Sequence, residues 1–263
     1  MADQCVWIIK LGEVEQLAQL VAAGLMGYGL QVKGQKWPTE EPQAWLPSAQ
    51  EAATGDAGLV VLVADPSLFA NPNLRRSLAL FRLSLQTRKN RKIDGFVFFQ
   101  GEMPDLKDSA SYCHRVLEDW LTVDPKTNWL AKAVARLHVP TQDKLPIAIG
   151  LHAHERLGVW LEVRRNPAAE SNGCFAGVSG QDVKIDFHAV GPKGRLPSRT
   201  VNEYELQGIK FDYMGLCFDA WGLQNALSPD HSYYVRLEGE PVYIAAGELP
   251  NGEIMGVDLV CLG

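Results

Sequence analysis

The chain has 263 residues, of which 46% are hydrophobic and 21% are charged, and its formal net charge is −6. These proportions are typical of a globular protein with a substantial apolar core, in one large domain or two of ordinary size. The longest apolar runs are far shorter than the roughly 20 residues of a membrane-spanning helix. The N-terminus carries an acid at Asp3 and no basic leader. We therefore expect a cytoplasmic protein without a membrane segment, and the negative charge argues against a protein that coats nucleic acid with its whole surface.

Up to about residue 140, segments typical of strands alternate with segments typical of helices. Short apolar runs rich in β-branched residues predict strands, and the run 58–64 is apolar on both faces, as in a strand inside a covered sheet. Apolar residues at spacings of three and four predict helices. In chain order we expect a strand at 5–11, a helix ending at Gly29, an edge strand at 30–37, a short helix after Pro47, a strand at 58–64, a helix from about Leu74, a strand at 92–101, and helices at 109–123 and 126–139.

Strands that alternate with helices imply a parallel sheet with right-handed crossovers. We therefore predict a three-layer α/β domain of the flavodoxin-like kind over residues 1–140. The segment 139–146 contains two prolines and mostly polar residues between them. It predicts a linker, which we place at 141–146.

The second half, residues 147–263, has a different pattern. Strand-like segments are separated by turn signals rich in glycine, proline and asparagine, and the Asn251-Gly252 pair between apolar stretches predicts a hairpin. Only 221–227 has the pattern of a helical turn. The strand-like segments are 147–165 (interrupted at Gly158), 181–191, 203–221, 232–249 and 253–263. This spacing predicts an all-β antiparallel sandwich or barrel.

Asp65 and Ser67 directly follow the most apolar strand of the first half. In an open parallel sheet, ligands bind just beyond the carboxyl ends of the strands, so these two residues are candidates for a catalytic or ligand-binding site. The alternative is a purely structural corner. In that case Pro66 ends the strand, and Asn71 or Asn73 caps the helix that follows.

The first half resembles the Toll/interleukin-1 receptor (TIR) domain family in outline, over residues 3–140. The similarity is carried by the strand CVWIIKL, the helix ending at Gly29, the strand LQVKGQKW, a segment around Trp45, and the stretch GLVVLVADPSLFANPNLRRSLALF. The C-terminal half has no such resemblance. For the first half, the resemblance implies a domain that assembles with partners in signalling, with bacterial defence as the implied context.

TIR domains that hydrolyse NAD carry a glutamate early in the helix after this strand. The corresponding positions here are Leu74, Arg75, Arg76 and Ser77. A cation there would oppose the positive charge that develops on the ribose as nicotinamide leaves. The resemblance therefore implies a scaffold without hydrolase chemistry and without a cofactor. An NAD or nucleotide hydrolase that uses Asp65 and Ser67 is the alternative.

The helix after this corner carries seven basic residues and one apolar stripe. Leu74, Leu78, Phe81 and Leu85 follow each other at spacings of four, three and four, which predicts a buried face. The basic residues, which we name the basic set, are Arg75, Arg76, Arg82, Arg88, Lys89, Arg91 and Lys92. They are either a solvated helix face or a surface that binds an acidic partner or another copy of the chain. Nucleic acid is less favoured, because no exposed aromatic residue is interleaved with them.

His152 and His154 are two residues apart on a predicted strand, so both side chains point to one face and could reach one metal ion, with His188 as a third ligand. Strand histidines more often face solvent, and we do not favour a metal site. The sequence lacks a nucleophile elbow, a phosphate-binding loop and a zinc-protease helix. The sequence as a whole therefore favours a non-catalytic two-domain protein, with a scaffold joined to a β-rich domain that recognises a ligand or partner.

Overall fold

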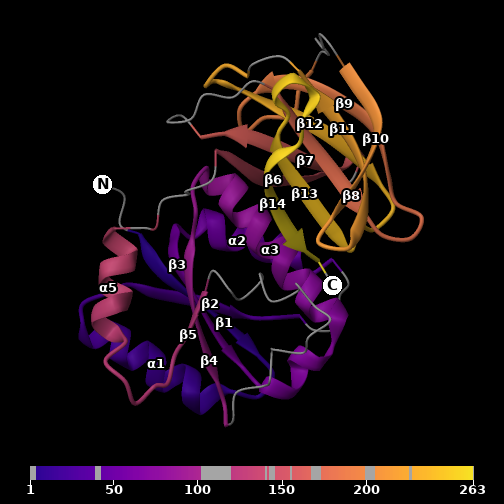
Figure 1. Ribbon diagram of the computed structural model, residues 1–263. Coiled ribbons are helices and arrows are strands. Elements are labelled where there is room, and N and C mark those ends of the chain that lie inside the picture. Colours follow the sequence, from indigo (N-terminus) through magenta and orange to yellow (C-terminus); the bar gives the residue numbers. More distant parts are fainter. Residues whose placement is uncertain are drawn as a thin grey trace. The chain divides into compact units, whose positions relative to one another are not determined.

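The computed structural model describes residues 4–38, 43–101, 120–139, 141, 146–154, 156–166, 173–198, 205–224 and 227–262 (Figure 1). The chain divides into two compact units, residues 1–142 with 263, and residues 143–262. We call them unit 1 and unit 2.

Unit 1 is an α/β domain around a parallel sheet of five strands (Figure 1). The strands are β1 (Cys5–Leu11), β2 (Val32–Lys36), β3 (Ala57–Ala64), β4 (Asp94–Phe99) and β5 (Trp120–Thr122). The helices are α1 (Glu15–Gly27), α2 (Trp45–Thr54), the short 3-10 helix η1 (Pro66–Ala70), α3 (Pro72–Lys89) and α5 (Leu130–His138). The sheet order is β2-β1-β3-β4-β5, and all neighbouring strands run parallel. The predicted parallel α/β class is confirmed.

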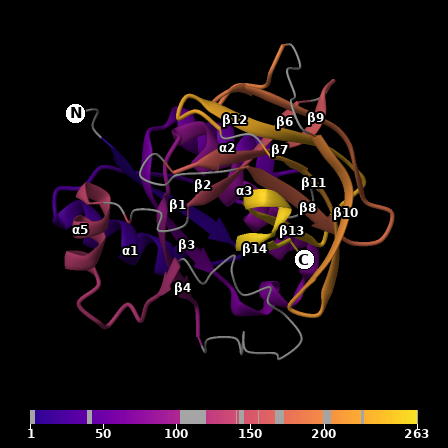
Figure 2. The ribbon, with the colours of Figure 1, turned by 45° about the horizontal axis from the view of Figure 1, so that its top comes forward.

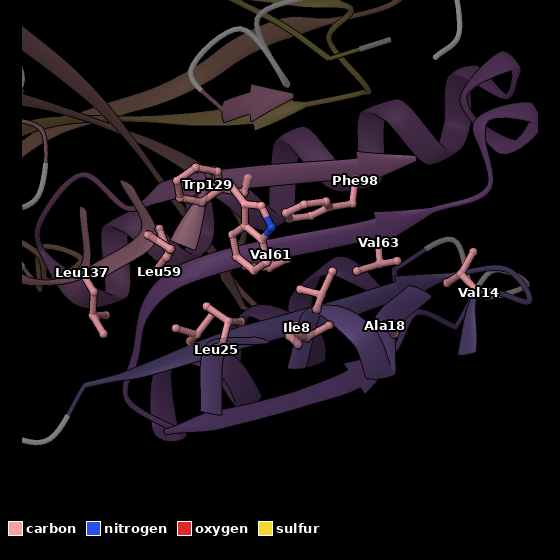
Figure 3. Packing of buried hydrophobic residues seen from close by; sticks show 14 residues of the cluster. Ile8, Val14, Ala18, Leu25, Leu59, Val61, Val63, Phe98, Trp129 and Leu137 are labelled. Carbon is pink, nitrogen blue, oxygen red and sulfur yellow. The ribbon is translucent and has the colours of Figure 1, made fainter. Parts of the chain in front are cut away.

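Helices cover both faces of this sheet. On one face, α1 and α5 pack against β1, β3 and β4, and the ring centroids of Phe98 and Trp129 lie 4.8 Å apart (Figure 3). Figure 1 shows α2 and α3 on the opposite face. There Trp37 packs edge-on against Phe81. Because β3 lies inside the sheet and is covered on both faces, all eight of its residues are buried, as its uninterrupted apolar sequence predicts.

The helix predicted at 109–123 is wrong at its C-terminal end, because Trp120–Thr122 forms β5 beside β4. An aromatic and a β-branched residue in this short segment suit a strand. Gly95 provides the space for this pairing, since a Cβ atom there would come within 2.3 Å of the Trp120 ring. Residues 109–119 lie outside the described part of the chain. The short helix predicted after Pro47 begins earlier, at Trp45, with Pro47 in the first turn, where its missing N–H leaves no bond unmade.

Unit 2 consists of two antiparallel sheets that stack face to face (Figure 2). Its strands are β6 (Ile147–His154), β7 (Gly158–Arg165), β8 (Cys174–Ser179), β9 (Lys184–Pro192), β10 (Glu205–Tyr213), β11 (Leu216–Leu223), β12 (His231–Glu238), β13 (Tyr243–Glu248) and β14 (Met255–Cys261). The sheet orders are β10-β11-β8-β13-β14 and β6-β7-β12-β9. The predicted all-β antiparallel class is confirmed, and of its two predicted forms, sandwich or barrel, the two separate sheets correspond to the sandwich.

Two local features of unit 2 test the predicted turns and strands. Asn251 and Gly252, both with positive φ, connect the antiparallel strands β13 and β14 through a short 3-10 turn (η3, Pro250–Gly252), so the predicted hairpin is confirmed. The helical turn predicted at 221–227 is wrong for its first three residues, which belong to β11.

Among the helices that the structure describes, none combines the length and the apolar character needed to cross a membrane.

Candidate functional site

The corner after β3 is held by its own side chains. Asp65 is the N-cap of η1, and its Oδ1 accepts hydrogen bonds from the Ser67 hydroxyl (2.7 Å) and the Ser67 backbone N–H (2.9 Å). These two hydrogen bonds, the hydroxyl first, lower the pKa of Asp65 below its ordinary value. Asn71 then caps α3 by accepting from the backbone N–H of Asn73 at 2.9 Å, as one of the two predicted caps. Both predicted site residues thus take part in a local capping turn.

The same turn packs against the end of β1. Gly12, which follows β1, has a φ of 84°, and a Cβ atom there would lie 3.1 Å from Leu68 Cδ1 and 3.2 Å from Asp65 Cβ. In open parallel sheets of this order, ligands bind between the carboxyl ends of β1 and β3. Here the side chains of the turn itself occupy the space beside Gly12.

We expect Asp65→Ala to lower the midpoint of thermal unfolding by a few degrees, because the first turn of η1 loses its capping acceptor. Ser67→Ala is the matched control. It removes the hydroxyl but keeps the backbone N–H, so a smaller effect is expected. Differential scanning calorimetry of the full chain measures both. An unchanged midpoint in Asp65→Ala would mean that the carboxylate does not serve as a cap.

The basic set on and after α3 is only partly exposed. Arg82 is 4% exposed, contrary to the expected solvated face, because residues 77–85 of α3 are all buried. The predicted apolar stripe of this helix is buried as expected, which confirms that part of the prediction. Arg88 is exposed, and Arg76 and Lys92 are half-buried.

Three other members of the basic set bind groups of unit 1. Arg75 Nη1 donates to the carbonyl of Phe69 at 2.6 Å and so extends the turn before α3. Lys89 forms an ion pair of 3.2 Å with Asp56. Arg91 donates to the Gln4 side chain at 3.2 Å, and burial lowers the pKa of its guanidinium. The cations therefore do not form one continuous exposed stripe, and Arg88 is the member most open to solvent contact.

The three histidines of the predicted metal set do not converge. His152 Nε2 lies 2.7 Å from Glu162 Oε2, whereas His154 is exposed and accepts from the Arg156 backbone N–H. His188 lies on the other face of the β6-β7-β12-β9 sheet. It pairs with Val235 of β12, whereas Glu162 pairs with Tyr234, and these two adjacent residues of β12 point to opposite faces. Within the described ranges, no three His, Cys, Asp or Glu side chains are grouped as metal ligands.

His188 belongs to a separate buried cluster. Its Nδ1 lies 2.8 Å from the Tyr233 hydroxyl, and its Nε2 lies 3.2 Å from Glu205 Oε2. The Trp221 ring packs edge-on against the imidazole at 5.0 Å. Burial raises the pKa of Tyr233, so its hydroxyl stays protonated and serves as a hydrogen-bonding group. These contacts hold the two sheets of unit 2 together through polar groups.

The main polar cluster of unit 2 centres on Glu162 of β7, which the sequence does not reveal. Glu162 is fully buried, and its Oε1 accepts from the Gly194 backbone N–H at 2.7 Å. The Tyr234 hydroxyl lies 3.1 Å from the same oxygen, donates to the Pro192 carbonyl at 2.6 Å and accepts from the Arg195 backbone N–H. The carboxylate and the tyrosine together hold the loop after β9 against the sheet.

The Glu162 carboxylate is ionised in this environment. Burial by itself raises the pKa of Glu162, but the hydrogen bonds from His152 and Gly194 and the charge of Arg164 outweigh it and lower the pKa to about 2. Since Glu162 accepts at His152 Nε2, the other ring nitrogen of a neutral His152 carries no proton.

No family model, curated protein or solved structure matches the chain.

Proposed function

We propose that the protein acts by binding and assembly rather than by catalysis. In this proposal, unit 1 is a TIR-like scaffold of the flavodoxin-like kind that binds a protein partner or another copy, and unit 2 recognises a ligand or partner. The strand order β2-β1-β3-β4-β5 with helices on both faces supports the assignment of unit 1, because it is the order of flavodoxin-like sheets. Signalling in bacterial defence is the context that the TIR-like sequence pattern implies.

The hydrogen bonding of Asp65 is the observation that supports the non-catalytic part of the proposal. A carboxylate that stabilises a ribosyl cation must face the substrate, but Asp65 Oδ1 accepts two hydrogen bonds within its own turn. The first turn of α3 contains no acidic residue that could replace it. Both observations favour a structural corner over the alternative of an NAD or nucleotide hydrolase.

The binding part of the proposal is supported by the cations at the end of α3. Arg88 and Lys89 lie in the last turn, where the helix dipole favours positive charge. An exposed Arg88 on a chain of net charge −6 can bind an acidic surface of a partner or of a second copy. The burial of Arg82 weakens the further alternative, a nucleic-acid accessory protein, because fewer cations are available for phosphates.

Two measurements on the full chain test this function. Incubation with NAD is expected to give no turnover, and sedimentation is expected to show assembly that Arg88→Glu weakens by about tenfold. Arg156→Glu in unit 2 is the control, since it makes the same charge change at an exposed arginine outside the basic set. NAD turnover that Asp65→Ala abolishes would contradict the proposal. So would assembly that responds equally to both charge reversals.

A further inference from the structure

The solvent-facing side of α1 is apolar and uncharged. Leu20 and Met26 of this helix are 61% and 56% exposed, and Tyr28, its C-cap, is 55% exposed. They lie in the stretch 16–32, which contains no charged residue. A surface helix ordinarily carries charged and polar residues on the face away from the core. Exposed large apolar side chains with no charges among them are typical of the centre of a protein–protein interface.

The exposed residues of α1 form one stripe along about three turns of the helix. They recur at spacings of three and four, on the side opposite the buried Ala18, Val21 and Leu25. After Glu15 at the start of the helix, the members of this stripe, which we name the α1 stripe, are Gln16, Gln19, Leu20, Ala23, Met26 and Gly27. The small residue Ala23 therefore lies near the middle of the stripe.

Gly27 is not required by the packing of unit 1. A Cβ atom there would have no neighbour within 4 Å, whereas a Cβ atom at Gly24 would lie 3.4 Å from Leu130 of α5. Gly29, with a φ of 77°, supplies the left-handed residue that follows the helix. Glycine is also one of the least favourable residues within a helix. The space beside Gly27 is thus free to receive a side chain from another molecule.

The absence of charge on this face favours a second copy of the chain as its partner. In a two-fold contact between copies, the face meets itself, so any charge near the axis would meet its like. Residues 16–32 present no such charge. Unit 1 contains 15 acidic and 15 basic residues, so two copies of it approach without net repulsion. A strongly charged partner would find no counter-charge on this face.

We propose that the α1 stripe is a homodimer interface, in which α1 of one copy packs antiparallel against α1 of a second copy. With the two-fold axis beside Ala23, the two Ala23 side chains face each other. Leu20 of each copy then lies over Gly27 of the other, because these residues lie three and four positions from Ala23 on the same flank of the stripe. The inference rests on the proposed function, since it names a second copy as a partner of unit 1 and gives the surface that binds it.

Sedimentation of the full chain over a range of concentrations tests the interface. Leu20→Glu is expected to weaken the dimer by about tenfold or more, because it places a charge in the apolar contact. Leu157→Glu is the matched control, since it makes the same change at a leucine of unit 2 that is 49% exposed, and it is expected to leave the dimer unchanged.

Gly27→Leu tests the same contact without a charge. The new side chain occupies the place of Leu20 of the other copy, and it is expected to weaken the dimer by about tenfold. The thermal midpoint of the dilute monomer is not expected to fall, because leucine favours a helix and the position is open within the chain. Circular dichroism shows whether each variant folds.

Cysteine cross-linking tests the symmetry of the contact. Ala23→Cys is expected to give a disulfide-linked dimer on mild oxidation, because a residue beside the two-fold axis meets its own copy. Gln16→Cys, at one end of the stripe, is the control and is expected to stay monomeric on a non-reducing gel. Both variants carry Cys217→Ser, because Cys217 is an exposed free cysteine.

The outcomes separate this inference from the proposed function. A chain that is monomeric at every concentration, an Ala23→Cys variant that does not cross-link, or equal weakening by Leu20→Glu and Leu157→Glu overturns the inference. Since α3 lies on the opposite face of the sheet from α1, the cross-link is expected to form equally in Arg88→Glu (Figure 1). If Arg88→Glu weakens assembly but the cross-link does not form, the proposed function stands and the inference fails. NAD turnover that Asp65→Ala abolishes, with the cross-link intact, overturns the proposed function and leaves the dimer.

Discussion

Replacing Glu162 by alanine is expected to destabilise unit 2 by about 3–5 kcal/mol, the largest effect of any single substitution discussed here. The change removes the acceptor for His152 Nε2 and for the Gly194 N–H, and it removes the negative charge that attracts the buried Arg164. Breaking a buried charged network on one side costs more than the network contributes when intact, because the remaining groups stay desolvated. Hydrogen exchange of peptides from β7 and β12 in the full chain measures the loss.

Glu238→Ala is the matched control for this prediction. Glu238 lies on β12 of the same sheet and pairs with Lys184 at 3.1 Å, but both side chains are about 60% exposed. An exposed pair of this kind contributes about 0–1 kcal/mol, so exchange rates are expected to change little. If both variants exchange alike, the network around Glu162 does not stabilise the sheet.

Acidification is expected to destabilise unit 2 between pH 4.5 and pH 2, through the same carboxylate. The pKa of Glu162 falls from its ordinary value of 4.5 to about 2 in the folded protein. Since the folded pKa is the lower one, the stabilisation is fully present above pH 4.5 and disappears as the pH falls through the folded value. The full contribution is on the order of 3 kcal/mol, at about 1.4 kcal/mol for each pH unit of difference.

Glu162→Gln tests this assignment, because glutamine has a similar shape and does not titrate in this range. The free energy of unfolding of unit 2 is measured by urea unfolding at a series of pH values, with hydrogen exchange as the readout. As the pH falls, this free energy is expected to decrease by roughly 3 kcal/mol less in the variant than in the wild type. If the free energy of unfolding falls equally with pH in the wild type and in the variant, other carboxylates cause the acid sensitivity.

The central strands of unit 1 could be predicted well because they are almost entirely apolar. β1 spans Cys5–Leu11, as its sequence pattern indicates, and β3 differs by one residue. β5 could not be predicted, because three residues carry too little periodicity to distinguish a strand from a helix end, and its pairing depends on the space above Gly95. Arg82 belongs to the basic set, which the sequence predicts to be exposed either as a solvated helix face or as a binding surface, but tertiary packing buries that part of α3.

The candidate sites of unit 2 were less predictable, since they depend on which loop covers which face. Glu162 alternates with Leu161 and Val163 along β7 and so has the pattern of a residue that faces solvent. In the described part of the chain, the loop around Gly194 binds its carboxylate, and nothing local in the sequence indicates where that loop lies. The sequence does not predict β8, because Cys174–Ser179 contains small residues and a glycine and lacks a clear alternation.

The attachment of the loop after β9 to Glu162 and Tyr234 has a consequence for the order of folding events. The contacts join residues separated by 32 positions (Gly194 to Glu162), 42 positions (Pro192 to Tyr234) and 72 positions (Glu162 to Tyr234) along the chain. Contacts at such separations form only after the entropy of closing long loops has been overcome. The loop therefore acquires this anchor only once β7, β9 and β12 have met.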